Sequence, residues 1–362
     1  MTGSTPARPR ILFLSHSHAF GPFRVGSHHY ARTLAQRGAD VVHLSTPISL
    51  AHRATGRVSR PDDAAVPRGP RRDADGVTHI IPRTTLPRPY GPFRVANELR
   101  RHGIGPEFDA VLIDQPLLWD DTVRGLTPRL VYRPTDLYPD GVKAERQRLI
   151  VAAADGVIAT SAEVLHGLGP LTVPALVLEN GVDAARFAQP SPEVGPRPAV
   201  CVYVGALDGR FDWTQLATWA RSNPEVRFAI AGPVAEPPVA LADNVELLGP
   251  IVYDAVPALL HGARVGLLPL SDDPLNAGRS PMKLYEYLSA GLAVLSRATP
   301  VIRADEGAGV FTYGEGVDAG AALDRALRHP SPNAAGTQRA SAESWHAKTD
   351  ALERIVWSVP AR

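Results

Sequence analysis

The chain has 362 residues, 44% of them hydrophobic and 21% charged, which is ordinary for a soluble globular protein and long enough for two domains. The single cysteine, Cys201, excludes a disulfide framework and fits a reducing cytoplasm. No run approaches the roughly 18 apolar residues of a membrane span, and the polar start lacks the apolar core of a signal peptide. We therefore expect a cytoplasmic protein.

The net charge of +1 hides an asymmetry along the chain. Residues 1–110 hold sixteen Arg, no Lys and eight acidic residues, a net charge of +8, whereas the remainder carries −7. A basic first part suits an anionic partner, which predicts peripheral contact with the inner face of a membrane. A compositional bias toward Arg is the alternative explanation. We expect no nucleic-acid partner.

Short apolar strands alternate with helical patterns along the whole chain, which predicts parallel α/β layers. Residues 53–75 are rich in Arg, Pro and Asp without periodicity and predict a long mobile loop. In the first half we expect a helix at about 27–36 and strands at 11–14, 41–44, 110–113, 130–132, 156–159 and 174–178. In the second half we expect strands at 199–204, 226–230, 245–248, 265–268 and 293–295.

The Pro-rich run 189–198 predicts an interdomain linker. We therefore expect one Rossmann-like domain at 1–185, a second at 186–340, and a C-terminal helix within 341–362 that packs across both domains. Two doubly wound domains facing one another would hold a ligand in the cleft, at the carboxyl ends of their strands.

The stretch 280–291 places a cation where a helix favours an acid. Ser280 is the predicted N-cap and Pro281 the first helical residue, which makes Lys283 the third. A helix N-terminus carries about half a positive charge, and Arg279 lies just outside the same end. Free N–H groups and two cations form an anion site, for which phosphate is the usual occupant. The alternative is a solvated Lys283 paired with Glu286.

Several fragments, taken in order, resemble the GT-B glycosyltransferases. Glu179-Asn-Gly-Val-Asp183 resembles the crossover between the two domains of that family, and residues 203–208, 230–233, 244–249 and 281–286 follow in the family's order and spacing. Residues 26–30 and 132–136 are similar to the glucuronosyltransferase of xanthan assembly and its relatives. The resemblance implies two doubly wound Rossmann-like domains, the first binding the acceptor and the second a nucleotide sugar, for which we expect a UDP-sugar such as UDP-glucuronate.

One departure from the family pattern bears on the mechanism. Many retaining members carry two Glu separated by seven residues in the stretch that ends here at Glu286, and the first would fall at Gly278. Its absence favours an inverting transfer, which needs one base at the acceptor hydroxyl. Asp136, directly after the strand 130–132, is our candidate, and Asp114 and Asp140 are competitors. The alternative for Asp136 is a turn or N-cap role.

His28 and His29 open the first predicted helix. Either is a candidate for binding acceptor or donor phosphate, or for acting as a rival base. The alternative is a structural histidine. Adjacent His residues point in different directions around a helix and the chain lacks the Asp-x-Asp motif of metal-dependent transferases, so we expect no metal and no resident cofactor.

In the second domain, Gly205 lets the backbone pass close to a ligand and Arg210 can reach a diphosphate. We assign Arg279, Ser280, Met282 and Lys283 to the same donor site. Glu286 resembles the family residue that accepts both ribose hydroxyls, an arrangement that suits a carboxylate. The resemblance also places the nucleobase near residues 249–252.

Other functions of the same fold stay open. One is a sugar-nucleotide epimerase or hydrolase. Another is a phosphorylase, which would need a pyridoxal-phosphate lysine near the chain end, where only Lys348 is available. A third is a non-catalytic nucleotide-sugar-binding protein. The acceptor is either a lipid-linked glycan or a small natural product.

Overall fold

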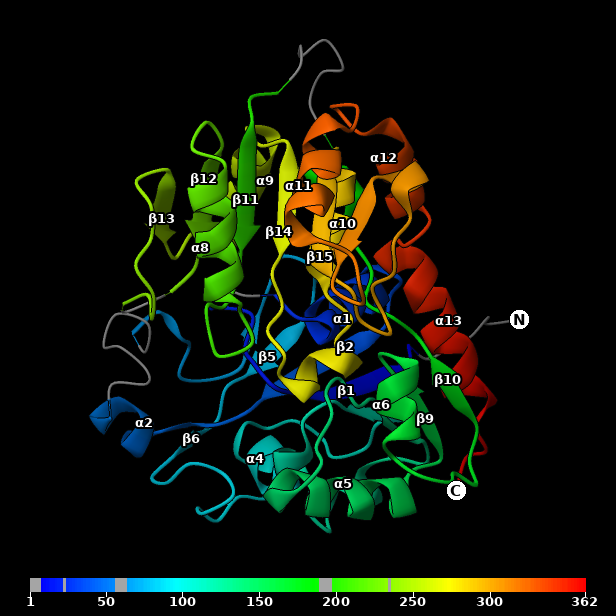
Figure 1. Ribbon diagram of the computed structural model, residues 1–362. Coiled ribbons are helices and arrows are strands. Elements are labelled where there is room, and N and C mark those ends of the chain that lie inside the picture. The colour runs from blue at the N-terminus through cyan, green and yellow to red at the C-terminus, as the bar shows by residue number, and fades with distance from the viewer. Residues whose placement is uncertain (1–7, 22–23, 56–63, 189–196, 234–235) are drawn as a thin grey trace. The chain divides into compact units, whose positions relative to one another are not determined.

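The computed structural model describes residues 8–21, 24–55, 64–188, 197–233 and 236–362. The chain divides into two compact units: residues 1–179 with 349–362, and residues 180–348 (Figure 1). The second unit therefore begins a few residues before the expected position 186. The helix α7 (Ala184–Phe187) already belongs to it, because Phe187 is fully buried in that unit's core.

The Pro-rich run 189–198 is consequently not the boundary between the units. It lies inside the second unit, and its residues 189–196 are outside the described part of the chain. The predicted linker itself therefore falls mostly outside the described residues, and it stays a prediction.

The first unit is built on an eight-stranded sheet with the order β10-β9-β8-β7-β1-β2-β5-β4. All neighbouring strands are parallel except β4 and β5. β1 lies between β2 and β7, so the strand order reverses at β1, and ligands of such sheets bind at the carboxyl ends of the strands there. The strands are β1 (Arg10–Ser15), β2 (Asp40–Ser45), β4 (Arg71–Arg72), β5 (Thr78–Ile80), β7 (Ala110–Ile113), β8 (Leu130–Tyr132), β9 (Gly156–Ala159) and β10 (Ala175–Val177). A separate pair joins β3 (Ile48–Ser49) and β6 (Arg83–Thr84).

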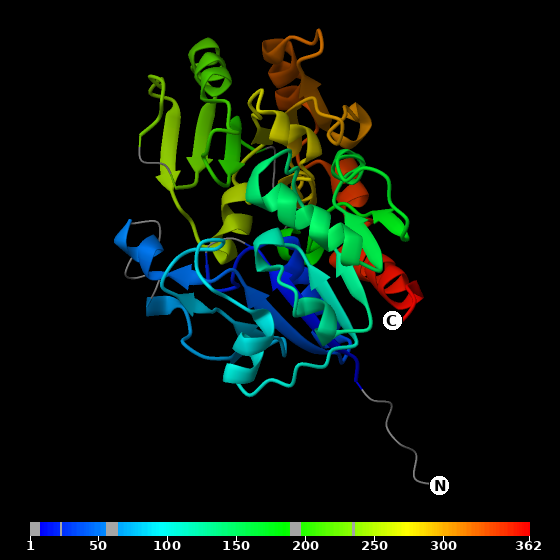
Figure 2. The ribbon, with the colours of Figure 1, turned by 90° about the horizontal axis from the view of Figure 1, so that it is seen from below.

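Helices cover both faces of this sheet, as a buried parallel sheet requires. Leu12 and Leu14 of β1 face the core formed with α4 and α5, the helices nearest the viewer in Figure 2. On β9, a Cβ at Gly156 would lie only 2.9 Å from a methyl of Val359, just beyond α13 (Trp345–Ser358), which crosses from the second unit into the first at Thr349. The remaining helices are α1 (Gly26–Gln36), α2 (Leu50–Ala54), α4 (Val95–Arg101), α5 (Gly141–Ala153) and α6 (Ala162–His166), with 3₁₀ turns at Pro116–Leu118 and Val123–Leu126.

The region 53–75 is more structured than its sequence suggests. Arg53 lies in α2, and Arg71–Arg72 pairs antiparallel with β5. Residues 56–63 lie outside the described chain. The strand β4 escaped prediction because two exposed arginines give no apolar pattern, and its pairing with β5 is a tertiary contact.

The second unit is built on a six-stranded, fully parallel sheet with the order β13-β12-β11-β14-β15-β16. β11 alternates between two cores: Val200 and Val202 pack with α10, and Cys201 and Tyr203 pack with α8 and α11, which lie in front of the sheet in Figure 1. The strands are β11 (Val200–Val204), β12 (Arg227–Ala231), β13 (Val245–Gly249), β14 (Val265–Leu268), β15 (Ala293–Arg297) and β16 (Val310–Tyr313). The other helices are α8 (Trp213–Ser222), α9 (Val256–His261), α10 (Met282–Ser289), α11 (Ala319–Arg328) and α12 (Ala334–Ser341), with 3₁₀ turns at Tyr253–Ala255, Pro274–Gly278 and Glu306–Ala308.

Candidate functional site

The helix α10 is fixed over the sheet of the second unit by Tyr287. A Cβ at Gly266 of β14 would lie 2.2 Å from the ring of Tyr287, so only glycine admits the ring there. The hydroxyl of Tyr287 then accepts a hydrogen bond from the backbone N–H of Val204, the last residue of β11, at 3.0 Å. Lys283 lies on the same face of α10 as Tyr287, because residues four apart share a helix face. Lys283 therefore lies near the carboxyl end of β11.

Lys283 lies directly against Gly205, the first residue after β11. A Cβ at Gly205 would be 2.3 Å from Cε of Lys283 and 2.7 Å from Nζ. The ammonium group is 5.9 Å from the ring centre of Tyr203. β11 lies between β12 and β14, so this contact is at the point where the strand order of the second unit reverses. The structure thus brings together two residues that are 78 positions apart in the sequence.

Two arginines add positive charge beside Lys283. Besides burial, the charges of Arg279 and Arg210 lower the pKa of Lys283. The same two charges oppose the rise that burial causes in the pKa of the Tyr203 hydroxyl. The guanidinium of Arg210 is held by the carboxylate of Asp208, with Nη2 and Oδ2 2.6 Å apart. Three cations and two carboxylates, those of Asp208 and Glu286, thus interact around Lys283, and this excess of positive charge suits a diphosphate.

Burial perturbs the titration of two α10 residues one turn apart. It lowers the pKa of Lys283, assisted by Arg279, and raises the pKa of Glu286, opposed by Lys283. Among the described residues no Lys283–Glu286 ion pair within 4 Å is found, although each charge acts on the pKa of the other. Glu286 instead hydrogen-bonds with Tyr253. Tyr253 follows residues 249–252, so the predicted ribose residue and the predicted nucleobase segment lie together.

The start of α10 differs from the prediction in one respect. The helix begins at Met282 with Pro281 as its N-cap, so Lys283 is the second helical residue rather than the third. Ser280 is not the cap: its Oγ accepts a hydrogen bond from the backbone N–H of Asn180 at 3.1 Å, and its carbonyl accepts one from the Asn180 amide at 2.7 Å. Ser280 therefore fixes the crossover segment, while Met282 is half-buried at the helix start.

In the first unit, Asp136 ends a chain of hydrogen bonds. The amide Nε2 of Gln115 donates to Nδ1 of His16 at 3.0 Å, and Nε2 of His16 lies 3.0 Å from the hydroxyl of Thr135. That hydroxyl donates to Oδ2 of Asp136 at 3.1 Å. Because an amide nitrogen only donates, Nδ1 of His16 accepts and Nε2 carries the proton. Burial lowers the pKa of His16, which keeps the ring neutral.

The two competing carboxylates have other surroundings. Asp114 is buried and held by two hydrogen bonds from Arg133, at 2.9 and 2.6 Å. The Arg133 guanidinium also lies 5.1 Å from the ring centre of Tyr30. A carboxylate engaged in a buried ion pair is a poor proton acceptor, so Asp114 is structural here. Asp140 is exposed at the N-cap position of α5.

His28 is a structural residue. Its Nδ1 accepts a hydrogen bond from the backbone N–H of Val25 at 3.2 Å, and its Nε2 lies 2.9 Å from the carbonyl of Ser17. Both ring nitrogens are thus engaged, and burial lowers the pKa to about 3. This geometry argues against His28 as the base. His29 is buried, with 4% of its surface exposed.

The structure gives no support to a metal centre or to a pyridoxal-phosphate lysine. In residues 8–362, leaving out the stretches that are not described, no group of three or more His, Cys, Asp or Glu is arranged to hold a metal. Lys348 is ion-paired with Glu343. Metal independence stays a prediction. No helix of the described chain combines the length and apolar character needed to cross a membrane.

The comparisons with known proteins agree with this architecture. Sucrose-phosphate synthase from Thermosynechococcus elongatus is similar to this chain with a TM-score of 0.68 and 14% sequence identity, over 96% of this chain and 98% of that one. Anabaena HepE in complex with UDP and glucose is similar with a TM-score of 0.67 and 15% sequence identity, over 97% of this chain and 100% of that one. The chain has the GT-B fold.

The sequence comparisons concern shorter segments of this GT-B chain. The model of the family described as glycosyl transferases group 1 matches residues 198–328, from β11 to the end of α11. A protein of Bacillus subtilis (strain 168) named for glycosyl transfer in teichuronic acid biosynthesis, TuaH, is 25% identical over 240 residues, 61% of this chain. The match spans 59% of the length of that relative.

Two residues of these sites escaped the sequence analysis. His16 directly follows β1, the central strand of the first unit. Ligands of doubly wound sheets bind at the carboxyl end of such a strand, so a polar residue at this position could have been predicted as a site residue. Tyr253 lies in a 3₁₀ turn after β13, and nothing in its neighbourhood in the sequence indicates its contact with Glu286.

Proposed function

We propose that this GT-B protein is an inverting glycosyltransferase that moves a sugar from a UDP-sugar to a hydroxyl of a lipid-linked glycan or natural-product acceptor. The observation that carries the proposal is the packing of Lys283 against Gly205, with Arg210 and Arg279 beside it, at the reversal point of the second sheet. This site lies within the segment matched by the group 1 family model. The presence of UDP and glucose in the HepE structure supports the choice of donor.

The second unit supplies the donor contacts in this proposal. Lys283, Arg279 and Arg210 neutralise the diphosphate, and their charge stabilises it further as it departs. Glu286 accepts hydrogen bonds from the two ribose hydroxyls, beside Tyr253. Gly205 keeps the space that a side chain would fill.

The first unit supplies the base. The Asp136 carboxylate takes the proton from the acceptor hydroxyl as its oxygen forms a bond to the anomeric carbon, and the bond from that carbon to the UDP oxygen breaks. Thr135 orients the carboxylate, and His16 orients Thr135.

Inversion is supported by Gly278, which is buried and stands where retaining relatives have a Glu. The configuration of the product tests this directly. A proton NMR spectrum recorded at early turnover should show the anomeric configuration opposite to that of the donor. A product with the donor's configuration would assign the enzyme to the retaining class.

The central experiment incubates the protein with a panel of UDP-sugars, with and without acceptors, and follows UDP release. Release that depends on an acceptor identifies transfer, and release in water alone identifies a hydrolase. A change of the sugar with no release of UDP identifies an epimerase. Calorimetric binding without any of these reactions identifies a nucleotide-sugar-binding protein. UDP-glucuronate belongs in the panel because the resemblance to the xanthan-type group suggests it.

We further propose peripheral contact of the basic residues 1–110 with the inner membrane face. Sedimentation with vesicles should show binding to acidic but not neutral lipid, and the binding should weaken with salt because exposed charges are screened. Equal binding to both vesicles, or none, points to a soluble acceptor and a soluble enzyme.

A further inference from the structure

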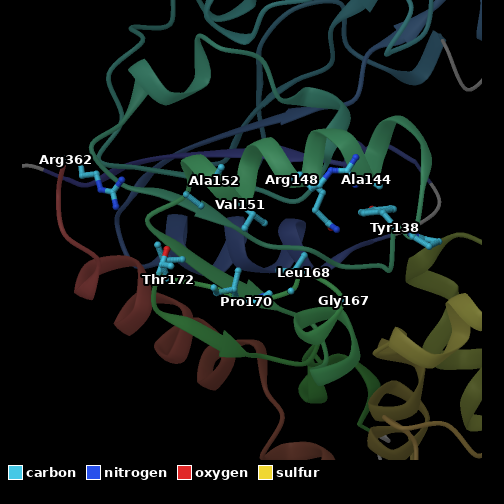
Figure 3. Close-up of a pocket in the computed structure, with 16 residues that line it drawn as sticks. Tyr138, Ala144, Arg148, Val151, Ala152, Gly167, Leu168, Pro170, Thr172 and Arg362 are labelled. Atoms are coloured by element: carbon cyan, nitrogen blue, oxygen red, sulfur yellow. The ribbon is translucent and has the colours of Figure 1, made fainter.

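A groove of about 680 Å³ runs along α5 in the first unit, within the range of about 300–1,000 Å³ typical of ligand sites. Figure 3 shows Tyr138 at one end and Arg362 at the other, with Arg148, Val151 and Ala152 on the helix between them. The opposite wall is the loop 167–173. Since α5 has 13 residues, the helix wall of the groove is about 20 Å long.

The sequence of α5 explains why this space exists. Small side chains, Ala144, Ala152 and Ala154, line the helix side and leave room that larger residues would fill. On the loop side, Gly169 has φ +76°, a left-handed conformation that suits glycine, and turns the chain away from the helix. The groove is therefore a consequence of residue size and loop geometry on both of its walls.

The lining suits an extended apolar chain with an anionic group. Leu168, Leu171 and Val173 are half-buried and present aliphatic surface to the groove. None of the lining residues is acidic. Arg148 is exposed and has no hydrogen bond or ion pair among the residues that the structure describes, whereas Arg362 is engaged with Asp155, their Nε and Oδ1 atoms 3.0 Å apart.

One end of the groove is adjacent to the proposed base. Tyr138 and Pro139 line that end, two and three residues after Asp136. Leu137 extends toward the loop wall, where a Cβ at Gly167 would lie 3.2 Å from its Cδ2. A molecule in the groove thus has one end close to Asp136 and the other near Arg362, all within one unit.

We propose that this groove binds the acceptor as a lipid phosphate, with its apolar chain along Val151, Leu168 and Leu171 and its phosphate at Arg148. The proposal rests on the proposed function and narrows its acceptor to the lipid-linked class. An elongated, half-apolar groove with one unpaired cation matches an extended amphipathic chain better than a compact natural product. The hydroxyl to be glycosylated belongs to the glycan linked to that phosphate, and it lies at the Tyr138 end, next to Asp136.

Calorimetry with farnesyl phosphate tests the proposal, with farnesol as the probe for the chain alone. UDP is kept saturating so that the cations of the second unit are occupied. The wild type should bind farnesyl phosphate. Ala152→Trp fills the groove and should weaken this binding at least about tenfold, by analogy with other overpacked sites. Leu149→Trp, on the same helix but outside the lining, is the matched control and should bind as the wild type does.

A substitution of Arg148 distinguishes binding of the phosphate from binding of the apolar chain. Arg148→Gln should weaken farnesyl phosphate binding about tenfold and leave farnesol binding unchanged, since only a charge-assisted hydrogen bond is lost. Arg71→Gln, an exposed arginine on β4, should change neither. Absence of binding to the wild type, or equal losses in Ala152→Trp and Leu149→Trp, would overturn the proposal. A dimer in sedimentation velocity that Ala152→Trp dissociates would also overturn it, in favour of a second copy of the chain.

The outcome is separable from that of the proposed function. Farnesyl phosphate binding that Ala152→Trp removes, without turnover of any UDP-sugar, keeps the groove and rejects only the enzyme activity. Turnover of a UDP-sugar with a soluble acceptor, without farnesyl phosphate binding, keeps the activity and rejects the groove.

Discussion

In the first unit β1 lies between β2 and β7, and in the second unit β11 lies between β12 and β14. Both central strands therefore end at a reversal of strand order, and each candidate site lies there. After β11 comes Gly205, with the ammonium of Lys283 packed against it. After β1 comes His16, hydrogen-bonded to the side chains of Gln115 and Thr135. The same topology thus presents a cationic surface in one unit and a neutral hydrogen-bond chain ending in a carboxylate in the other.

The difference follows from how each site is filled. In the second unit a glycine leaves space, and the cations come from α10, from the segment before it and from the loop after β11, so the site is complementary to an anion. In the first unit, polar side chains from three strand ends hydrogen-bond with one another, and the chain of bonds ends at Oδ2 of Asp136. Under the proposed function, the second unit would bind the donor and the first unit would accept the proton.

The largest expected effect is at Asp136. Asp136→Asn keeps the shape but removes the proton acceptor, so kcat should fall by about 10²–10⁴ with UDP affinity unchanged. Single-turnover kinetics and calorimetry measure the two quantities, and Asp140→Asn is the matched exposed control. Full activity in Asp136→Asn, with loss in His16→Ala or His29→Ala, would move the base to a histidine.

The next effect is on donor affinity. Lys283→Ala should weaken UDP binding by about 1.5–3 kcal/mol because a charge-assisted hydrogen bond is lost. Isothermal calorimetry measures the change, and Asp136→Asn serves as the control that lowers turnover without affecting UDP. An unchanged dissociation constant in Lys283→Ala would remove the diphosphate from this site.

The pH dependence of UDP binding sharpens the same assignment. Burial and Arg279 lower the pKa of Lys283 to about 8, and only its protonated form attracts the diphosphate. Affinity should therefore fall above about pH 8 by up to about tenfold per pH unit, while the phosphate, with a second pKa of about 6, stays fully ionised. Calorimetry from about pH 7.5 to 9.5 measures this. Lys283→Arg should remove the dependence, and a persistent decline would assign it to another group.

The smallest effect tests the role of space. Gly205→Ala places a methyl group against Cε of Lys283 and also strains a backbone whose φ is +158°, so UDP affinity should fall about tenfold. Gly209→Ala, in the same loop with no heavy atom within 4 Å of the added Cβ, should leave the affinity unchanged. Thermal unfolding of both variants controls for stability. Equal affinities would show that the packing of Lys283 against Gly205 is incidental.

Local pattern was sufficient for much of the fold. The strands at Ala110–Ile113, Leu130–Tyr132, Gly156–Ala159 and Val265–Leu268 occur where their apolar runs predict them, because fully buried strands are continuous apolar segments. The lysine in the first turn of α10 could also be predicted from the sequence, since its position depends only on residues close in sequence. The predicted N-cap at Ser280 was wrong because the side chain of Ser280 instead contacts Asn180, 100 positions away in the sequence.

The sequence by itself determined the α/β class, the cation at α10 and the glycine after β11. Only the tertiary structure decided which strand ends meet: His16 contacts Gln115, 99 positions away, and Thr135, 119 positions away. It also decided that Asp114 forms an ion pair with Arg133, whereas Asp136 accepts a hydrogen bond from Thr135. The physical reason is that hydrophobic periodicity is a property of neighbouring residues, whereas the strand order that assembles a site is set by the packing of whole layers.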